Sequence, residues 1–221
     1  MPMTDLAQLA GRFSAVYTGS VADVLDRLGH LHQTLPSSIR PLRSGMRLAG
    51  PAYPVEGHPK PDADYDTSLR ATLAMLGAVP PGHVAVYQTH GEASAHLGEL
   101  SVTSLKSRGV TGAVIDGGCR DVDFMLREDY PVFCSHVTPQ DCTHRWQVTG
   151  HGDVTIDVGG VRVAPGDWVV ADEDGCVVIP APLVTDVLEA AEAMVATENE
   201  IRDAVRDGVT PLAAYERYGT F

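Results

Sequence analysis

The stretch from residue 83 to residue 116 constrains the fold of this chain more than any other segment. Residues 83–88 (HVAVYQ) and 112–116 (GAVID) are short apolar runs rich in β-branched side chains, which favours two buried strands. The segment between them, from about Gly98 to Arg108, has the apolar spacing of a helix. A strand, a helix and a second strand in this order predict two parallel strands joined by a crossover. We therefore expect an α/β protein.

The remaining sequence predicts further elements around this unit. Proline, glycine and short apolar runs predict strands between Pro36 and Pro61. Further strands are expected at 132–137, 154–158, 161–163, 167–171 and 176–179, and helices at about 5–18, 20–28, 67–76 and 183–206, followed by a short tail. We expect one domain covering residues 1–221, with a mixed sheet and a C-terminal helix, because no repeat or linker divides the chain.

Charge and cysteine content exclude several classes of function. The chain has 29 acidic and 16 basic residues and a formal charge of −13, which argues against nucleic acid or an anionic membrane as a partner. The four cysteines form no C-x-x-C pair, so reduced, packed thiols are expected rather than a zinc site. Without a leader-like or membrane-spanning apolar run, a cytoplasmic location is expected.

Chemically useful side chains gather in two loops that follow the predicted parallel strands. The first loop, 89–98, and the helix start after it supply Glu92, His96 and Glu99, and the second loop is 116–121 (DGGCRD). In open parallel sheets, ligands bind beyond the carboxyl ends of the strands. Neighbouring strands should therefore place the two loops side by side.

These loops predict a site for a small carboxylic acid and a cation. The free amides of a helix that begins at Gly98 can bind an anion, and the planar fork of Arg120 can hold a carboxylate and a carbonyl oxygen. Asp121 and Glu99 offer the oxygen ligands that Mg²⁺ or Mn²⁺ prefers. In 116–121, the two glycines are expected to allow a tight turn close to the ligand. The combination suits a 2-oxo acid.

Each of these residues also has an ordinary structural explanation. Arg120 and Asp121 could form a solvated pair, and Glu99 could simply complement the helix dipole. His96 is expected to be a structural histidine, because no second histidine stands at helical spacing. Glu198 falls on the apolar stripe of the last predicted helix, where it is either a buried or intersubunit acid or a residue near a frayed end. Only the coincidence of several such residues favours a functional site.

The same residues resemble the signature of the RraA-like family. HLGEL at 96–100, the twenty residues that separate Glu99 from Arg120, and IDGGCRD at 115–121 are similar to its acid-x20-Arg-Asp pattern. GSVADVLDRLG at 19–29 and PGD with ADEDGCVVIP at 165–180 are similar to other parts of that family. The family includes 4-hydroxy-4-methyl-2-oxoglutarate/4-carboxy-4-hydroxy-2-oxoadipate aldolases and the RraA regulators of ribonuclease E.

The resemblance implies a swivelling β/β/α fold, a homotrimer or hexamer with sites between subunits, and a divalent metal, Mg²⁺ or Mn²⁺. It implies Asp121 as metal ligand, Arg120 as the residue that binds the 2-oxo acid, and Glu99 as the acid that holds water on the metal. Backbone amides of Gly98, Leu100 and Ser101, at the helix start, would receive the carboxylate. Glu99 stands where the aldolases usually carry Asp, and Glu198 matches an acid that they contribute from a neighbouring chain.

These expectations lead to a hypothesis and its rival. The hypothesis is a metal-dependent lyase that cleaves a 4-hydroxy-2-oxo acid to pyruvate and a second carbonyl product, with oxaloacetate decarboxylation as a related activity. The catalytic base, the exact substrate and the metal stay open. Lys60 and Lys106, the two lysines, lie in a Pro-rich loop and between polar residues, which disfavours a Schiff base. The rival is a noncatalytic, RraA-type regulator that binds a ribonuclease.

Overall fold

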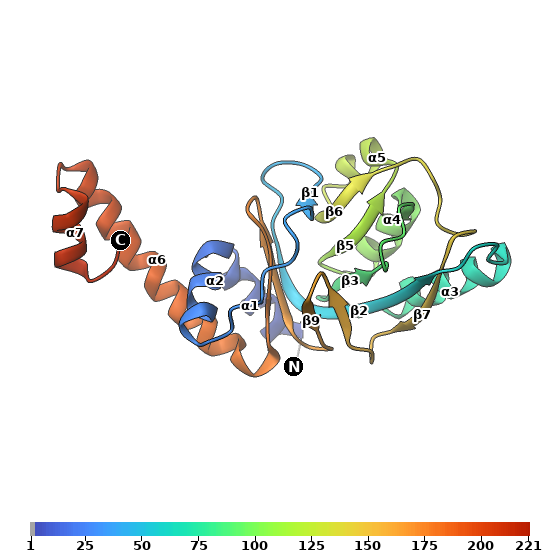
Figure 1. The fold of residues 1–221 in the computed structure, drawn as a ribbon, viewed down its shortest axis with the longest axis horizontal. Helices are drawn as coiled ribbons and strands as arrows, with labels where there is room; N and C mark the ends of the chain where they lie inside the picture. Colours follow the sequence, from blue (N-terminus) through green and yellow to red (C-terminus); the bar gives the residue numbers. More distant parts are fainter. Residues whose placement is uncertain (1–2) are drawn as a thin grey trace.

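The chain folds around one mixed β-sheet in a computed structural model that describes residues 3–221 (Figure 1). Strands follow the order β1-β6-β5-β3-β2-β10-β11, with β4 paired to β5 and β7 paired to β2. The four strands β2, β3, β5 and β6 are mutually parallel, whereas β1, β7, β10 and β11 pair antiparallel. The carboxyl ends of the parallel strands therefore meet at one edge, as the sequence predicts.

The elements have the following bounds. The strands are β1 (Arg40–Pro41), β2 (Leu48–Pro59), β3 (Val84–Gln88), β4 (Ala95–Leu97), β5 (Gly112–Cys119), β6 (Val132–Val137), β7 (Trp146–His151), β8 (Ile156–Val158), β9 (Val161–Val163), β10 (Trp168–Asp172) and β11 (Gly175–Ile179). The helices are α1 (Met3–Phe13), α2 (Thr18–Arg27), α3 (Tyr65–Ala78), α4 (Glu99–Ser107), α5 (Val122–Arg127), α6 (Val184–Arg206) and α7 (Pro211–Tyr218), with one 3₁₀ turn at Ala181–Leu183.

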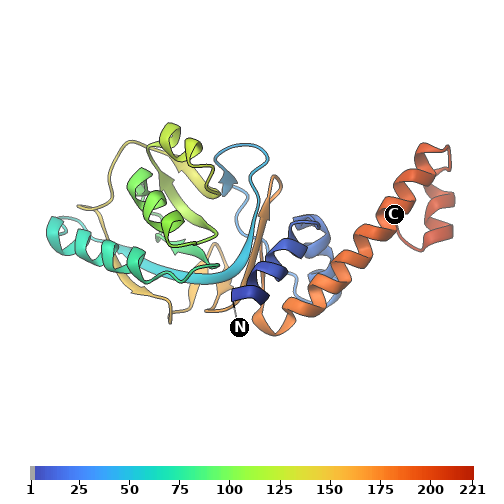
Figure 2. The ribbon, with the colours of Figure 1, turned by 180° about the vertical axis from the view of Figure 1, so that it is seen from behind.

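Three apolar clusters hold these elements together. Helices α3, α4 and α5 cover one face of the parallel strands, where Tyr87 and Ile115 are fully buried. The β8–β9 hairpin packs on the opposite face against Val86 and Val114. Helices α1, α2 and α6 pack on β10 and β11, and the far part of α6 with α7 projects away from the sheet (Figures 1 and 2). No helix within residues 3–221 has the length and apolarity needed to span a membrane.

The predicted strand-helix-strand unit is confirmed, as are the mixed sheet and the long C-terminal helix. β3 and β5 are parallel neighbours with Val84 opposite Gly112, and α4 connects them. The first helix, however, ends at Phe13 rather than near Gly19. The guanidinium of Arg47 donates hydrogen bonds to the carbonyls of Ser14 and Val16, which stabilises a non-helical path there.

The prediction of a loop at 116–121 is wrong for residues 116–119, which belong to a strand. β5 continues to Cys119, and neither Gly117 nor Gly118 has a positive φ. A Cβ on Gly117 would lie 2.8 Å from Nδ1 of His96, and one on Gly118 would lie 2.7 Å from the carbonyl oxygen of Ser94. These glycines therefore permit close packing within a strand rather than a turn. The sequence interpretation also missed β4, α5, β7 and α7.

Asp172 supports a prediction about stability. Its buried carboxylate accepts hydrogen bonds from the amide and hydroxyl of Thr18, at 2.9 and 2.6 Å, and thereby caps α2 from a distant strand. We expect Asp172→Ala to lower the free energy of unfolding by about 2–4 kcal/mol, because buried polar partners lose a charged acceptor. Urea unfolding measures this loss. Glu200→Gln, on an exposed part of α6, is the control, and equal stability of both variants would contradict the assignment.

Candidate functional site

The two predicted loops lie side by side at the carboxyl edge of the sheet. β4 pairs with the end of β5, and the amide of Arg120 donates a hydrogen bond to the carbonyl of Leu97 at 3.0 Å. Immediately beyond, the amide of Glu99 donates to Oδ2 of Asp121 at 3.2 Å. A Cβ on Gly98 would lie 2.6 Å from the same carboxylate oxygen. Glycine at position 98 therefore allows the acid and the helix start to meet.

The backbone of Asp121 is left-handed, with φ of 60° and ψ of 35°. Few residues other than glycine adopt this conformation, although aspartate tolerates it better than most. Its carbonyl accepts the first hydrogen bonds of α5, from the amides of Phe124 at 3.0 Å and Met125 at 3.1 Å. The turn thus ends β5 at the site and directs the chain into α5.

Arg120 is held by an acid that the sequence interpretation missed. A guanidinium nitrogen of Arg120 lies 2.8 Å from Oδ2 of Asp141, and its Nε lies 3.7 Å from Oδ2 of Asp121. Burial acts to raise the pKa of Asp141, but hydrogen bonds from Thr143 and the charge of Arg120 outweigh it and lower the pKa. Asp141 is therefore an ionised partner of Arg120 at neutral pH.

Arg120 and Asp121 together separate two pockets. One, of about 540 Å³, lies between α3 and α4 and is also lined by Leu69, Leu100 and Ser101. The other, of about 410 Å³, lies over α5 and the end of β6. The side chains of Arg120 and Asp121 are 37% and 43% exposed, so both are accessible from either pocket. A small ligand can thus reach the guanidinium and the carboxylate at once.

The first turn of α4 supplies hydrogen-bond donors to the larger pocket. The amide of Glu99 is used by Asp121, whereas the amides of Leu100 and Ser101 have no acceptor among the described residues. Oε1 of Glu99 accepts a hydrogen bond from the hydroxyl of Thr103 at 3.2 Å. Two open amides beside an arginine form a suitable environment for a carboxylate.

His96 is among the residues that line the larger pocket, and it is buried. The sequence-based prediction of a structural histidine agrees with this burial. Its ring packs edge-on against Trp146 with centroids 4.8 Å apart, and neither ring nitrogen has a hydrogen-bond partner in the described part of the chain. Nε2 lies 3.4 Å from Oε2 of Glu92. Burial lowers the pKa of His96 to about 4, against the opposing charge of Glu92, so the ring is neutral at pH 7.

The donor set at Asp121 fits a hard divalent cation. Mg²⁺ commonly binds through one or two carboxylates and keeps several waters, so a single accessible carboxylate between two open pockets is sufficient. Neither lysine lines these pockets. Lys60 bonds the side chain of Gln147, and Lys106 bonds Glu128. The local chemistry therefore suits metal-assisted reactions better than an amine nucleophile.

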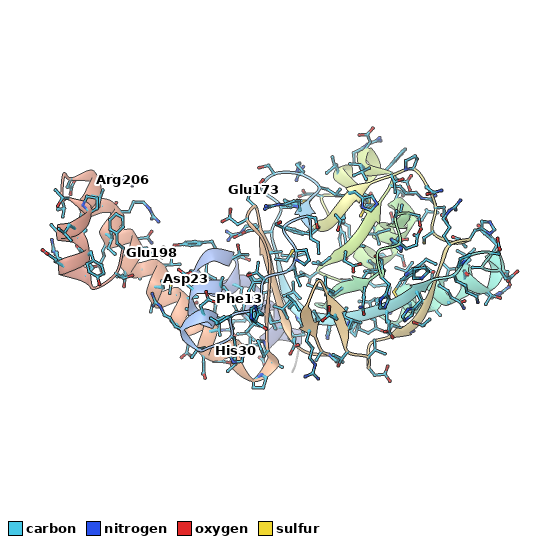
Figure 3. All side chains as sticks on the ribbon, viewed as in Figure 1. Phe13, Asp23, His30, Glu173, Glu198 and Arg206 are labelled. Atoms are coloured by element: carbon cyan, nitrogen blue, oxygen red, sulfur yellow. The ribbon has the colours of Figure 1, made fainter. Side chains whose placement is uncertain are left out.

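Glu198 is not brought to this site within the chain. It lies on α6, in the projecting part of the molecule, whereas Glu99 begins a helix that packs on the sheet (Figures 1 and 3). There Glu198 borders a separate, mostly apolar pocket with Ile201, Val205 and Phe221. Any role for Glu198 in the chemistry at Arg120 thus requires a second copy of the chain.

Comparison with known proteins identifies the family of this chain. Residues 18–178 match the sequence profile of the RraA-like family, described as Aldolase/RraA. The chain belongs to the RraA-like family. An RraA-like relative from Halalkalibacterium halodurans, named "Putative 4-hydroxy-4-methyl-2-oxoglutarate aldolase", is 30% identical over 92% of this chain and 91% of its own. Protein DlpA of Legionella pneumophila is 29% identical over 91% of this chain, which spans only 32% of DlpA.

A solved structure confirms the RraA-like fold. The structure of Streptomyces coelicolor RraAS2, described as an unusual member of the RNase ES inhibitor RraA protein family, superposes with a TM-score of 0.81. It is 30% identical and covers 89% of this chain and 98% of its own. The mixed α/β architecture predicted from the RraA-like resemblance is therefore correct.

Proposed function

We propose that this RraA-like protein is a divalent-metal-dependent lyase that cleaves a 4-hydroxy-2-oxo acid to pyruvate and a second carbonyl compound. The observation that carries the proposal is the convergence of Arg120, Asp121 and the open amides of α4 on one pocket. The Halalkalibacterium relative, with its aldolase name and nearly full coverage, supports the same class of reaction.

Binding follows from the chemistry of the pocket. The substrate carboxylate accepts hydrogen bonds from the amides of Leu100 and Ser101, at the positive end of α4. Arg120 donates to the carboxylate and to the 2-oxo oxygen, because its planar fork presents two parallel N–H groups. Asp121 would hold Mg²⁺ or Mn²⁺ next to the same oxygen. The side chains of α3, such as Leu69, then contact the distal end of the substrate.

The bond-breaking step places negative charge where Arg120 can stabilise it. Loss of the 4-hydroxyl proton lets the C3–C4 bond break, and its electron pair passes into the 2-oxo group to form the enolate of pyruvate. Protonation at C3 then completes the reaction. The chemistry that a cation at Asp121 would supply is Lewis-acid stabilisation of the enolate oxygen. Decarboxylation of oxaloacetate gives the same enolate and is proposed as a side activity.

Two carboxylates are proposed to receive the 4-hydroxyl proton through water. The backbone amide of Glu99 bonds the carboxylate of Asp121, although Glu99 is not among the residues that line the two pockets, and Glu198 would come from a neighbouring subunit in a homotrimer or hexamer. Mixing an inactive Glu198→Gln protein with an inactive Arg120→Ala protein tests this arrangement. Subunit exchange should restore part of the activity if each site takes Arg120 from one chain and Glu198 from another. No recovery after verified exchange would contradict such shared sites.

A regulator is the second candidate, favoured by the likeness to Streptomyces RraAS2. The two proposals are separated by a coupled assay of pyruvate release from oxaloacetate and from 4-hydroxy-4-methyl-2-oxoglutarate, with Mg²⁺ or Mn²⁺ and with a chelator. Metal-dependent turnover of either compound supports the lyase. No turnover together with tight binding to a ribonuclease would overturn the lyase and favour the regulator.

Replacing Asp141 tests whether this residue positions Arg120 for substrate binding or takes part in the chemical step. Asp141→Asn removes the ion pair that holds Arg120, so we expect the KM for the 2-oxo acid to rise about tenfold, with a smaller fall in kcat. Asp66→Asn, which breaks an exposed ion pair on α3, is the control. Steady-state kinetics of both variants measure the split, and unchanged KM in Asp141→Asn would show that Arg120 needs no such support.

A further inference from the structure

A second cluster of metal-binding side chains lies outside the pockets beside Arg120. Oε1 of Glu56 is 3.6 Å from Nε2 of His58 and 4.0 Å from Nε2 of His90, and the three donor atoms all lie within 4.8 Å of one another. The two imidazole rings stack with centroids 4.0 Å apart. Within residues 3–221, no other trio of histidine, cysteine or acidic side chains converges in this way.

Strand alternation in β2 and a left-handed turn after β3 bring the three side chains together. The pairing of β2 with β7 shifts register between Glu56 and Gly57, because Thr149 of β7 has no partner in β2. His90 follows β3 in a left-handed conformation, with φ of 55°, and Gly91 continues the turn with φ of 75°. Glu56 and His58, two residues apart in β2, thus meet His90 from the turn that follows the parallel neighbour β3.

The cluster lies on the other face of the sheet from the Arg120 pocket. A Cβ on Gly57 would overlap Trp146, on the side covered by α3 and α4, so its neighbours Glu56 and His58 lie on the opposite side. The side chain of Gln88, paired with Glu56 in the register, accepts a hydrogen bond from the amide of Asp157 in β8. Neither pocket at Arg120 includes any of the three residues.

We propose that Glu56, His58 and His90 form a binding site for a divalent transition metal such as Zn²⁺, Co²⁺ or Ni²⁺. Two imidazoles and one carboxylate suit these borderline metals rather than Mg²⁺, which prefers oxygen ligands. Tetrahedral ligands about 2.0–2.1 Å from zinc lie about 3.4 Å apart. Metal binding would therefore bring the three donor atoms, now within 4.8 Å of one another, closer together, and would rotate the stacked imidazole rings until both nitrogen lone pairs face the ion.

Three protein ligands leave one coordination position open. The exposed fractions of the side chains, 50% for His58, 32% for His90 and 30% for Glu56, show that water or a ligand can reach that position. A site of this type can bind an additional anion or a small molecule through the metal. The inference concerns metal binding alone and does not rest on the proposed lyase function.

The test is titration of the full, tag-free protein with Co²⁺, followed by its visible absorption, and then competition by Zn²⁺. With excess Mg²⁺ present to occupy the proposed site at Asp121, we expect one tightly bound Co²⁺ per chain and at least about 100-fold weaker binding in His58→Asn and in His90→Asn. His32→Asn, an exposed histidine elsewhere, is the matched control. Absence of Co²⁺ and Zn²⁺ binding, or equal binding by wild type and both ligand variants, would overturn the proposal.

A second measurement uses only the wild-type protein, so it does not depend on how the variants fold. Substoichiometric Co²⁺ should shift or broaden the imidazole proton signals of two histidines and leave the remaining seven unaffected. Their assignment to His58 and His90 supports the site. Perturbation of any other pair of histidines, or of none, contradicts it.

Discussion

We expect replacement of Arg120 by alanine to lower kcat/KM for pyruvate release at least about 1,000-fold. In the proposed reaction the guanidinium binds the carboxylate and stabilises the developing enolate oxygen, so its loss removes binding and transition-state stabilisation together. Arg120→Lys keeps the charge but loses the planar fork, and we expect it to recover only a small part of the activity. Coupled assays under saturating Mg²⁺ measure both variants.

The effect of Arg120 must be separated from general damage to the protein. Arg43→Ala breaks an exposed ion pair with Asp129, away from the pocket, and should leave turnover unchanged. Circular dichroism checks that Arg120→Ala stays folded. Turnover of folded Arg120→Ala within a factor of ten of the wild type would contradict the role given to this residue.

We expect mild acid to destabilise the protein through His96. The pKa of this buried ring is lowered to about 4, while an unfolded histidine titrates near its ordinary value of 6.5. As the pH falls below 6.5, the unfolded state therefore binds a proton that the folded state refuses, and the free energy of unfolding decreases. Between pH 7.5 and pH 5 we expect a loss of about 2 kcal/mol, which levels off below pH 4.

A non-titrating residue isolates this contribution. His96→Leu should remove most of the decline in stability between pH 7.5 and pH 5, whatever its effect on the absolute stability. His32→Leu, at an exposed position, should keep the wild-type slope. Urea unfolding at several pH values gives the comparison. A slope that persists unchanged in His96→Leu would assign the acid sensitivity to other groups.

The sequence predicts the centre of the candidate site because topology alone brings its parts together. Parallel strands end at a common edge, so the segments after β3 and β5 had to meet, and Gly98 and Asp121 are indeed in contact. The extension of β5 to Cys119 was missed because glycines usually indicate turns. Here they are required by the close approach of His96 and Ser94.

Other parts of the site depend on contacts that leave no periodic signal. Asp141 comes from an irregular loop after β6, and its contact with Arg120 is set by the fold rather than by spacing. The meeting of Glu56, His58 and His90 depends on the pairing of β2 with β3 and on a left-handed residue in the turn after β3. Hydrophobic patterning predicts neither feature, because it does not specify which strands pair or which turn residue has a positive φ.

The most direct test of the account is hydrogen exchange at the methyl group of pyruvate in D₂O, followed by proton NMR. This test does not require the distal part of the substrate to be known, because pyruvate is a product of every proposed substrate. We predict that the protein with Mg²⁺ accelerates loss of the methyl signal, and that chelation, Arg120→Ala and Asp121→Asn each abolish the acceleration. Exchange no faster than in protein-free solution, at saturating pyruvate and Mg²⁺, would contradict the proposal that this site forms an enolate.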